Sequence, residues 1–173
     1  MTEPAHDLRP LAPGILLALL AILFGFGLGG AFGAAEDSIK GSLRASADAV
    51  FETTYAGDAA KRDAVVSKSW SYMKRAHLHG GAIGAAALAS IVLLGLFGSP
   101  GMLERVSATA FGAGALLYAC FWLAAGLTAP GLGSTGEAKE ALGFLAIPGS
   151  GLCMLGLIGT IVSALRHARG SAV

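Results

Sequence analysis

The stretch WSYMKRAHLHGGAIG, residues 70–84, passes from charged to apolar side chains within a few positions. Upstream of it lies the long polar segment 36–76, and downstream an apolar run without Asp, Glu, Lys or Arg extends to Phe97. Such a change is typical of a helix that leaves water and enters a lipid bilayer. The stretch therefore indicates a membrane protein, and it places His77 and His79 at the boundary.

The composition of the 173-residue chain agrees with a membrane protein. Hydrophobic residues make up 54% of it and charged residues 13%, against about a quarter charged in soluble domains. The formal net charge of +1 lacks the strongly basic character of nucleic-acid-binding proteins. Cys120 and Cys153 lie in apolar runs with no CxxC spacing, so the sequence predicts neither a disulfide framework nor a structural zinc site.

Four apolar segments are long enough to cross a bilayer as helices: 14–33, 78–97, 106–128 and 141–165. A helix of about 20 residues rises about 30 Å, the thickness of the hydrocarbon core. The first segment reads as a retained span rather than a signal peptide, because acids precede it and its apolar run is long. The prediction is an all-α integral membrane protein, a single four-span domain over 1–173, with four transmembrane helices in an antiparallel bundle.

The polar segment 36–76 has helical spacing rather than the pattern of a loop. Its apolar side chains recur near helical intervals on both sides of Ala56-Gly57-Asp58, which predicts a turn with Asp58 as the cap of the next helix. We expect the first two helices to extend beyond the lipid as an extramembrane helical hairpin, about 30 Å long. The alternative is a pair of amphipathic helices lying on the membrane surface.

Glycines recur every four residues in two of the spans. Gly25, Gly29 and Gly33 lie in the first, and Gly80 and Gly84 in the second. Small residues at this spacing let helix backbones approach closely in a membrane. The pattern favours a structural or accessory subunit that is a homo-oligomer or is bound to other membrane subunits, in contact with the lipid bilayer and not with nucleic acid.

Potential metal ligands meet where the first two spans are connected. Glu36 and Asp37 follow the first span, and His77 and His79 begin the second. Sequential antiparallel helices place all four at a similar depth. Because two imidazoles and two carboxylates suit a first-row transition metal, these four residues are the candidate metal ligands, and a metal- or haem-binding redox membrane protein is the alternative function.

Helix geometry restricts this site. Residues two apart on a helix point about 200° from each other, so a regular helix cannot aim His77 and His79 at one ion. We expect His77 to face the bundle with Glu36 or Asp37 as its partner, in a metal site, in a hydrogen bond that joins two helices, or in a proton-linked role. A haem with two histidine ligands would need one from each of two copies.

Motifs of known enzymes are missing from the sequence, including the Walker loop, G-x-S-x-G, HExxH and CxxCH. A non-catalytic protein is therefore favoured, and a small oligomeric transporter stays as a further alternative, although no Asp, Glu, Lys or Arg lies within the four spans. The expected location is a bacterial inner (cell) membrane, with the orientation left open. Glu104 and Arg105 are predicted to be a solvated pair that contributes little energy.

Overall fold

The molecule consists of long helices. The computed structural model describes residues 7–170, and there it is all-helical. Its elements are η1 (Arg9–Leu11), α1 (Ala12–Asp48), α2 (Phe51–Thr54), α3 (Ala59–Leu96), α4 (Met102–Leu132), α5 (Thr135–Ala141) and α6 (Gly143–Gly170). Helices α1, α3, α4 and α6 are long and apolar enough to cross a membrane, with mean hydropathy between 1.7 and 2.4 in their most apolar stretches. The prediction of four long apolar helices packed together is confirmed.

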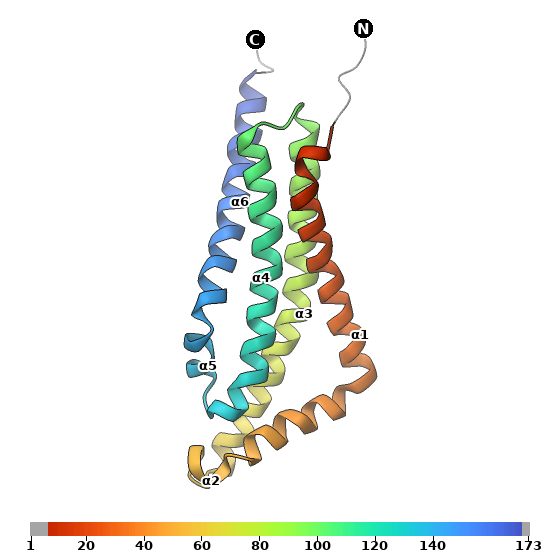
Figure 1. The fold of residues 1–173 in the computed structure, drawn as a ribbon. Coiled ribbons are helices and arrows are strands. Elements are labelled where there is room, and N and C mark those ends of the chain that lie inside the picture. The colour runs from red at the N-terminus through yellow and green to blue at the C-terminus, as the bar shows by residue number, and fades with distance from the viewer. Residues whose placement is uncertain (1–6, 171–173) are drawn as a thin grey trace.

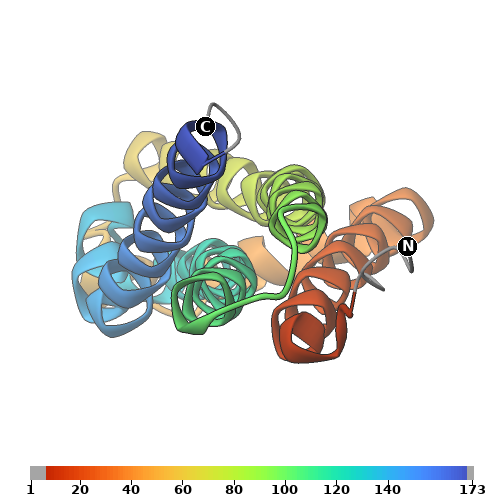
Figure 2. The same cartoon turned by 90° about the horizontal axis from the view of Figure 1, so that it is seen from above.

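Helices α3 and α4 occupy the centre of the bundle. Helix α1 packs on both of them, and α6 packs mainly on α4. Seen from above, α1 and α6 therefore lie on opposite sides of the central pair (Figure 2). Helix α1 starts and α6 ends at the same end of the bundle, while α2 and α5 lie at the other end (Figure 1). We call these the terminal end and the polar end.

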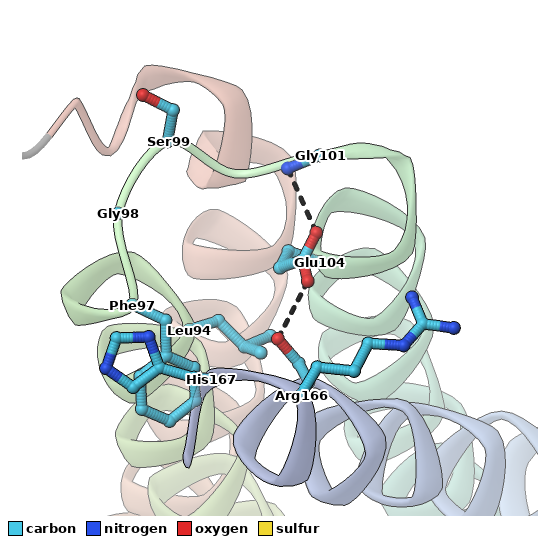
Figure 3. A pocket seen from close by; sticks show the side chains of 9 residues that line it. Leu94, Phe97, Gly98, Ser99, Gly101, Glu104, Arg166 and His167 are labelled. Atoms are coloured by element: carbon cyan, nitrogen blue, oxygen red, sulfur yellow. Dashed lines mark hydrogen bonds between the residues drawn. The ribbon is translucent and has the colours of Figure 1, made fainter. Parts of the chain in front are cut away.

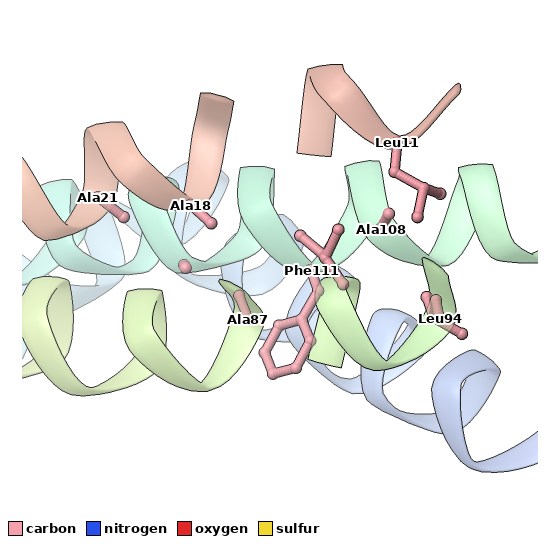
Figure 4. Packing of buried hydrophobic residues seen from close by; sticks show 9 residues of the cluster. Leu11, Ala18, Ala21, Ala87, Leu94, Ala108 and Phe111 are labelled. Atoms are coloured by element: carbon pink, nitrogen blue, oxygen red, sulfur yellow. The ribbon is translucent and has the colours of Figure 1, made fainter. Parts of the chain in front are cut away.

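Many of the side chains between the helices are alanines, and many large apolar side chains point outward. Leu23 is 66% exposed, Phe26 71% and Ile147 75%. Figure 4 shows the inside of the same bundle, where short alanine side chains sit between the helices. The buried cluster includes Leu11, Ala18, Ala21, Ala87, Ile91, Leu94, Ala108, Phe111 and Ala115. In water this distribution would be unfavourable, whereas lipid solvates the outward-facing leucine and phenylalanine side chains.

The backbones of α1 and α3 touch at two glycines. A Cβ atom on Gly25 would lie 2.5 Å from the backbone nitrogen of Gly81. One on Gly80 would lie 2.9 Å from the carbonyl oxygen of Ala21. No side chain fits in either place, so glycine is required there for the helices to approach this closely.

Among the other glycines that recur every four residues, two contact the neighbouring helix and one does not. Gly29 lies against the ring of His77, and Gly84 lies against Ile22, whereas a Cβ on Gly33 would meet nothing within 4 Å. Four of the five glycines at this spacing are thus used between α1 and α3 of one chain. The expectation of a homo-oligomer rested on these glycines, and their use within one chain removes that support.

Helix α1 bends at Ala35, whose backbone angles leave the helical region at φ −141° and ψ 28°. Beyond the bend, its second part crosses below the bundle towards α2, while α3 has no comparable break (Figure 1). The sequence predicted that both helices extend upright beyond the lipid, whereas in the structure only α3 continues without a break. The bend lies at the end of the apolar run, directly before Glu36, where water or lipid headgroups could satisfy the released backbone groups.

The part of α1 beyond the bend is packed rather than splayed. Its Leu43 and Ala47 are buried, and Ala47 belongs to a cluster with Tyr55, Val65 and Ala129. Ion pairs tie the same segment to α3: Arg44 to Asp63 at 3.0 Å and Arg62 to Asp48 at 2.9 Å. The polar end therefore forms a compact cap on the bundle.

The turn between α2 and α3 agrees with the prediction from the sequence. Ala56 and Gly57 have positive φ angles of 52° and 72°, and Asp58 Oδ1 accepts a hydrogen bond of 2.9 Å from the backbone nitrogen of Lys61. Just before it, the buried hydroxyl of Tyr55 donates to the carbonyl oxygen of Pro130 at 2.7 Å. Burial raises the pKa of Tyr55, so this donor keeps its proton at neutral pH.

Replacing Gly25 tests the contact between α1 and α3. We expect Gly25→Ala to lower the free energy of unfolding by roughly 1–3 kcal/mol, because the added methyl forces the two backbones apart. Gly27→Ala is the matched control, since a Cβ at Gly27 meets nothing within 4 Å. Thermal unfolding in detergent measures both variants, and equal melting temperatures for the two would contradict the described contact.

Removing the hydroxyl of Tyr55 tests the packing of the polar end. Tyr55→Phe should cost about 1–2 kcal/mol of stability, because the carbonyl of Pro130 loses a buried donor. Tyr118→Phe is the control, because the Tyr118 hydroxyl forms no hydrogen bond among the residues that the structure describes. The measurement is again thermal unfolding, and a Tyr55→Phe variant as stable as the control would argue against the bond.

Candidate functional site

His77 joins α3 to α1 through the backbone. Its Nδ1 atom lies 2.7 Å from the carbonyl oxygen of Gly25. A carbonyl oxygen can only accept, so Nδ1 carries the proton in this hydrogen bond. The ring packs on Gly29, where a Cβ would lie 2.7 Å from the His77 Cε1 atom. The interhelical partner of His77 is therefore a carbonyl, and not the Glu36 or Asp37 carboxylate that the sequence suggested.

His79 lies on another side of the same helix. Its ring stacks on that of Tyr118 in α4, with centroids 5.3 Å apart, and meets Trp122 at 6.0 Å. Because α3 is a continuous helix here, His77 faces α1 and His79 faces α4. The two imidazoles are not directed at a common point.

The two carboxylates also have other surroundings. Glu36 pairs with Lys40 one turn further along α1, and Asp37 is exposed. Within residues 7–170, no three or more His, Cys, Asp and Glu side chains form a group that would hold a metal ion. The structure therefore does not bring His77, His79, Glu36 and Asp37 together as one group, and their role as metal ligands stays a prediction. Any external ligand of His77 would have to approach Nε2, because Nδ1 is engaged.

His77 and Glu36 nevertheless line one groove of about 380 Å³ at the bend of α1. Phe32 and Trp70 form its aromatic wall, with ring centroids 4.9 Å apart in an edge-to-face contact. Lys74 completes the lining together with Gly29 and Gly33. Sequence reasoning found the histidine and the carboxylate but missed Trp70 and Lys74, although their spacing of four residues puts them on the same side of a helix at the membrane boundary.

An aromatic and cationic cluster lies on the side of α3 that faces α4. The Arg75 guanidinium carbon is 4.9 Å from the ring centroid of Trp122 and 5.4 Å from that of Tyr72. These distances are in the range of cation–π contacts. The buried Trp122 Nε1 atom has no hydrogen-bond partner among the described residues. The contacts explain how a charged arginine is held beside the apolar part of the bundle.

A second cavity, of about 300 Å³, opens at the terminal end between the α3–α4 loop and α6. Figure 3 shows Glu104 at its centre, hydrogen-bonded on both sides. One carboxylate oxygen accepts from the backbone nitrogen of Gly101 at 2.9 Å, and the other accepts from Ser163 Oγ at 2.7 Å. Arg166 lines the same cavity. Glu104 therefore caps α4 and ties it to α6.

This arrangement corrects the expectation of a solvated pair between Glu104 and Arg105. The structure contains no ion pair between them in its described part, and Glu104 is bonded to Gly101 and Ser163 instead. Arg105 Nε instead donates to the carbonyl oxygen of Pro100 at 3.2 Å.

Removing the Ser163 hydroxyl tests the link between α4 and α6. Ser163→Ala is expected to lower stability by about 1–3 kcal/mol, because a half-buried carboxylate loses a donor. Ser99→Ala, in an exposed position of the same cavity wall, should leave the melting temperature unchanged. If Ser163→Ala behaves like Ser99→Ala, the hydrogen bond does not join the helices.

The fold and these sites define a class rather than a reaction: a helical bundle with four candidate transmembrane helices joined by backbone and side-chain contacts at both ends. Comparisons of the chain with protein-family models, characterised proteins and solved structures found no match.

Proposed function

We propose that this protein is a multi-pass protein of a cell membrane with a structural or accessory role. In this proposal α1, α3, α4 and α6 are the spans, and the polar segment 36–76 lies outside the hydrocarbon. The observation that carries it is the large apolar surface, on which Leu23, Phe26, Ile147 and many other large side chains face outward, while many alanines lie between the helices. A bilayer is the solvent in which that surface is favourable.

The positions of the polar contacts support a structural role. Between the two ends, the apolar runs carry no Asp, Glu, Lys or Arg, whereas transporters and proton pumps use ionisable groups at that depth. The polar side chains that are present join helices to each other, as His77 does with Gly25 and Ser163 with Glu104. The redox alternative is less favoured, because His77 and His79 face different helices.

An accessory role requires a surface for partners, and α6 is the best candidate. It packs mainly on α4, so most of its circumference is free within this chain. Phe144, Ile147 and Leu155 are more than half exposed there. We infer that contacts with other membrane subunits, or with further copies of the chain, form on this face and not on the glycine stripes of α1 and α3.

Cysteine labelling tests the proposed spanning arrangement. Glu52→Cys places a thiol at the polar end and Met102→Cys places one at the terminal end, in a background with Cys120 and Cys153 replaced by alanine. A maleimide that cannot cross membranes should label the two thiols from opposite sides of sealed vesicles. Labelling of both from one side would contradict a bundle that crosses the bilayer, and unsealed vesicles provide the control for full reactivity.

A further inference from the structure

Trp70 separates two hollows on the outer face of the polar end. The first is the groove of about 380 Å³ described above, which contains Phe32, Glu36, Lys74 and His77. The second, about 360 Å³, is lined by Trp70 together with Lys40, Arg44, Asp63, Val66 and Ser67. Trp70 thus lines both hollows, at the point where α1 bends away from α3.

The first groove lies where the apolar surface ends. The apolar run of α1 ends at Ala35, two residues after Gly33, and Glu36 begins the polar part. Gly33 and Glu36 line the same groove. At Gly33 a Cβ would meet nothing within 4 Å, so the groove is open on its apolar side. A tryptophan at this depth is typical of the interface between hydrocarbon and headgroups.

One of the cations that line the two hollows has no ion pair among the described residues. Lys40 is paired with Glu36 and lies 5.3 Å from the ring centroid of Trp70. In the second hollow, Arg44 is paired with Asp63. Lys74 is exposed and has no ion pair among the residues that the structure describes. Because Lys40 pairs with Glu36 from the second hollow, Lys74 is left as the charge without an ion pair among the described residues that line the first groove, beside an aromatic wall and an apolar opening.

We propose that this groove binds the phosphate of an anionic phospholipid, with the Lys74 ammonium as its counter-ion. Trp70 then lies beside the ester region of the lipid, and an acyl chain runs along the glycine-lined face of α1 past Gly33. A membrane lipid is the favoured source of the phosphate because the polar and apolar parts of the groove meet as those of a lipid do. The inference rests on the proposed membrane placement.

The purified full-length chain in a neutral detergent provides the test. Phosphatidylglycerol, phosphatidylcholine or inorganic phosphate is added, and the rise in melting temperature gives an apparent affinity. We expect phosphatidylglycerol to stabilise the protein more than phosphatidylcholine does, and inorganic phosphate to have no comparable effect. Lys74→Gln should weaken the phosphatidylglycerol effect about fivefold, because a lysine near a lipid phosphate contributes about 1 kcal/mol.

Lys68→Gln is the matched control, since it removes the same charge from the same helix at an exposed position outside both hollows. It should keep the response of the unmodified chain, and Lys74→Glu should lose more of it than Lys74→Gln. Equal losses in Lys68→Gln and Lys74→Gln would indicate general charge attraction and overturn the site. An equal response to inorganic phosphate would make it a free-anion site and also overturn the proposal.

A separate measurement distinguishes this inference from the proposed function. Alkaline carbonate extraction of cell membranes reports whether the chain is embedded. A chain that washes out contradicts the membrane placement and the lipid site together. A chain that stays in the membrane but shows no response that depends on Lys74 contradicts the lipid site alone.

Discussion

The rest of the bundle depends on how closely α1 and α3 approach each other. At Gly25 and Gly80 the two backbones leave no room for a side chain. In lipid, apolar side chains gain nothing by leaving one hydrocarbon environment for another, so helices associate through dispersion contacts and hydrogen bonds. Close backbone approach maximises the first of these, and the bond from His77 to the Gly25 carbonyl provides the second at the same place. Gly25 and Gly80 therefore stabilise the tertiary structure and are not free for assembly.

The second constraint is the end of the apolar surface, where α1 and α3 follow different paths. Helix α1 bends at Ala35 as soon as its apolar run is complete, while α3 continues into the polar end. The bend lets Leu43 and Ala47 pack against the bundle and opens the groove at Trp70. One local departure from helical geometry thus produces both the compact polar cap and the site proposed for a lipid headgroup.

Much of the fold follows from the sequence because hydrophobic length and helix caps are local properties. The four apolar segments, the turn at Gly57 and the cap at Asp58 could be recognised without a structure. The bend at Ala35 could not, because nothing in the local sequence distinguishes it from a continuing helix. Nor could the sequence tell whether glycine stripes face another helix of the same chain or a second copy.

The candidate site was predictable only in part, for a related reason. Helical spacing showed that His77 and His79 diverge, and it placed His77 towards the bundle. It did not show that a backbone carbonyl, rather than Glu36 or Asp37, would accept the hydrogen bond from the imidazole, because that depends on the glycine contact. Glu104 and Ser163 are 59 residues apart, so their bond appears only once α4 and α6 are placed together.

The accessibility of α1 to lipid tests the central account most directly. Spin labels placed singly along residues 16–26 report collision with oxygen dissolved in the bilayer. We expect a profile with helical period, with maxima at Leu16, Leu23 and Phe26 and minima at Ala18, Ala21 and Gly25, following the exposure of these residues in the structure. Maxima at Ala18 and Ala21, with protected leucines, would contradict the packing of small residues inside and large ones outside.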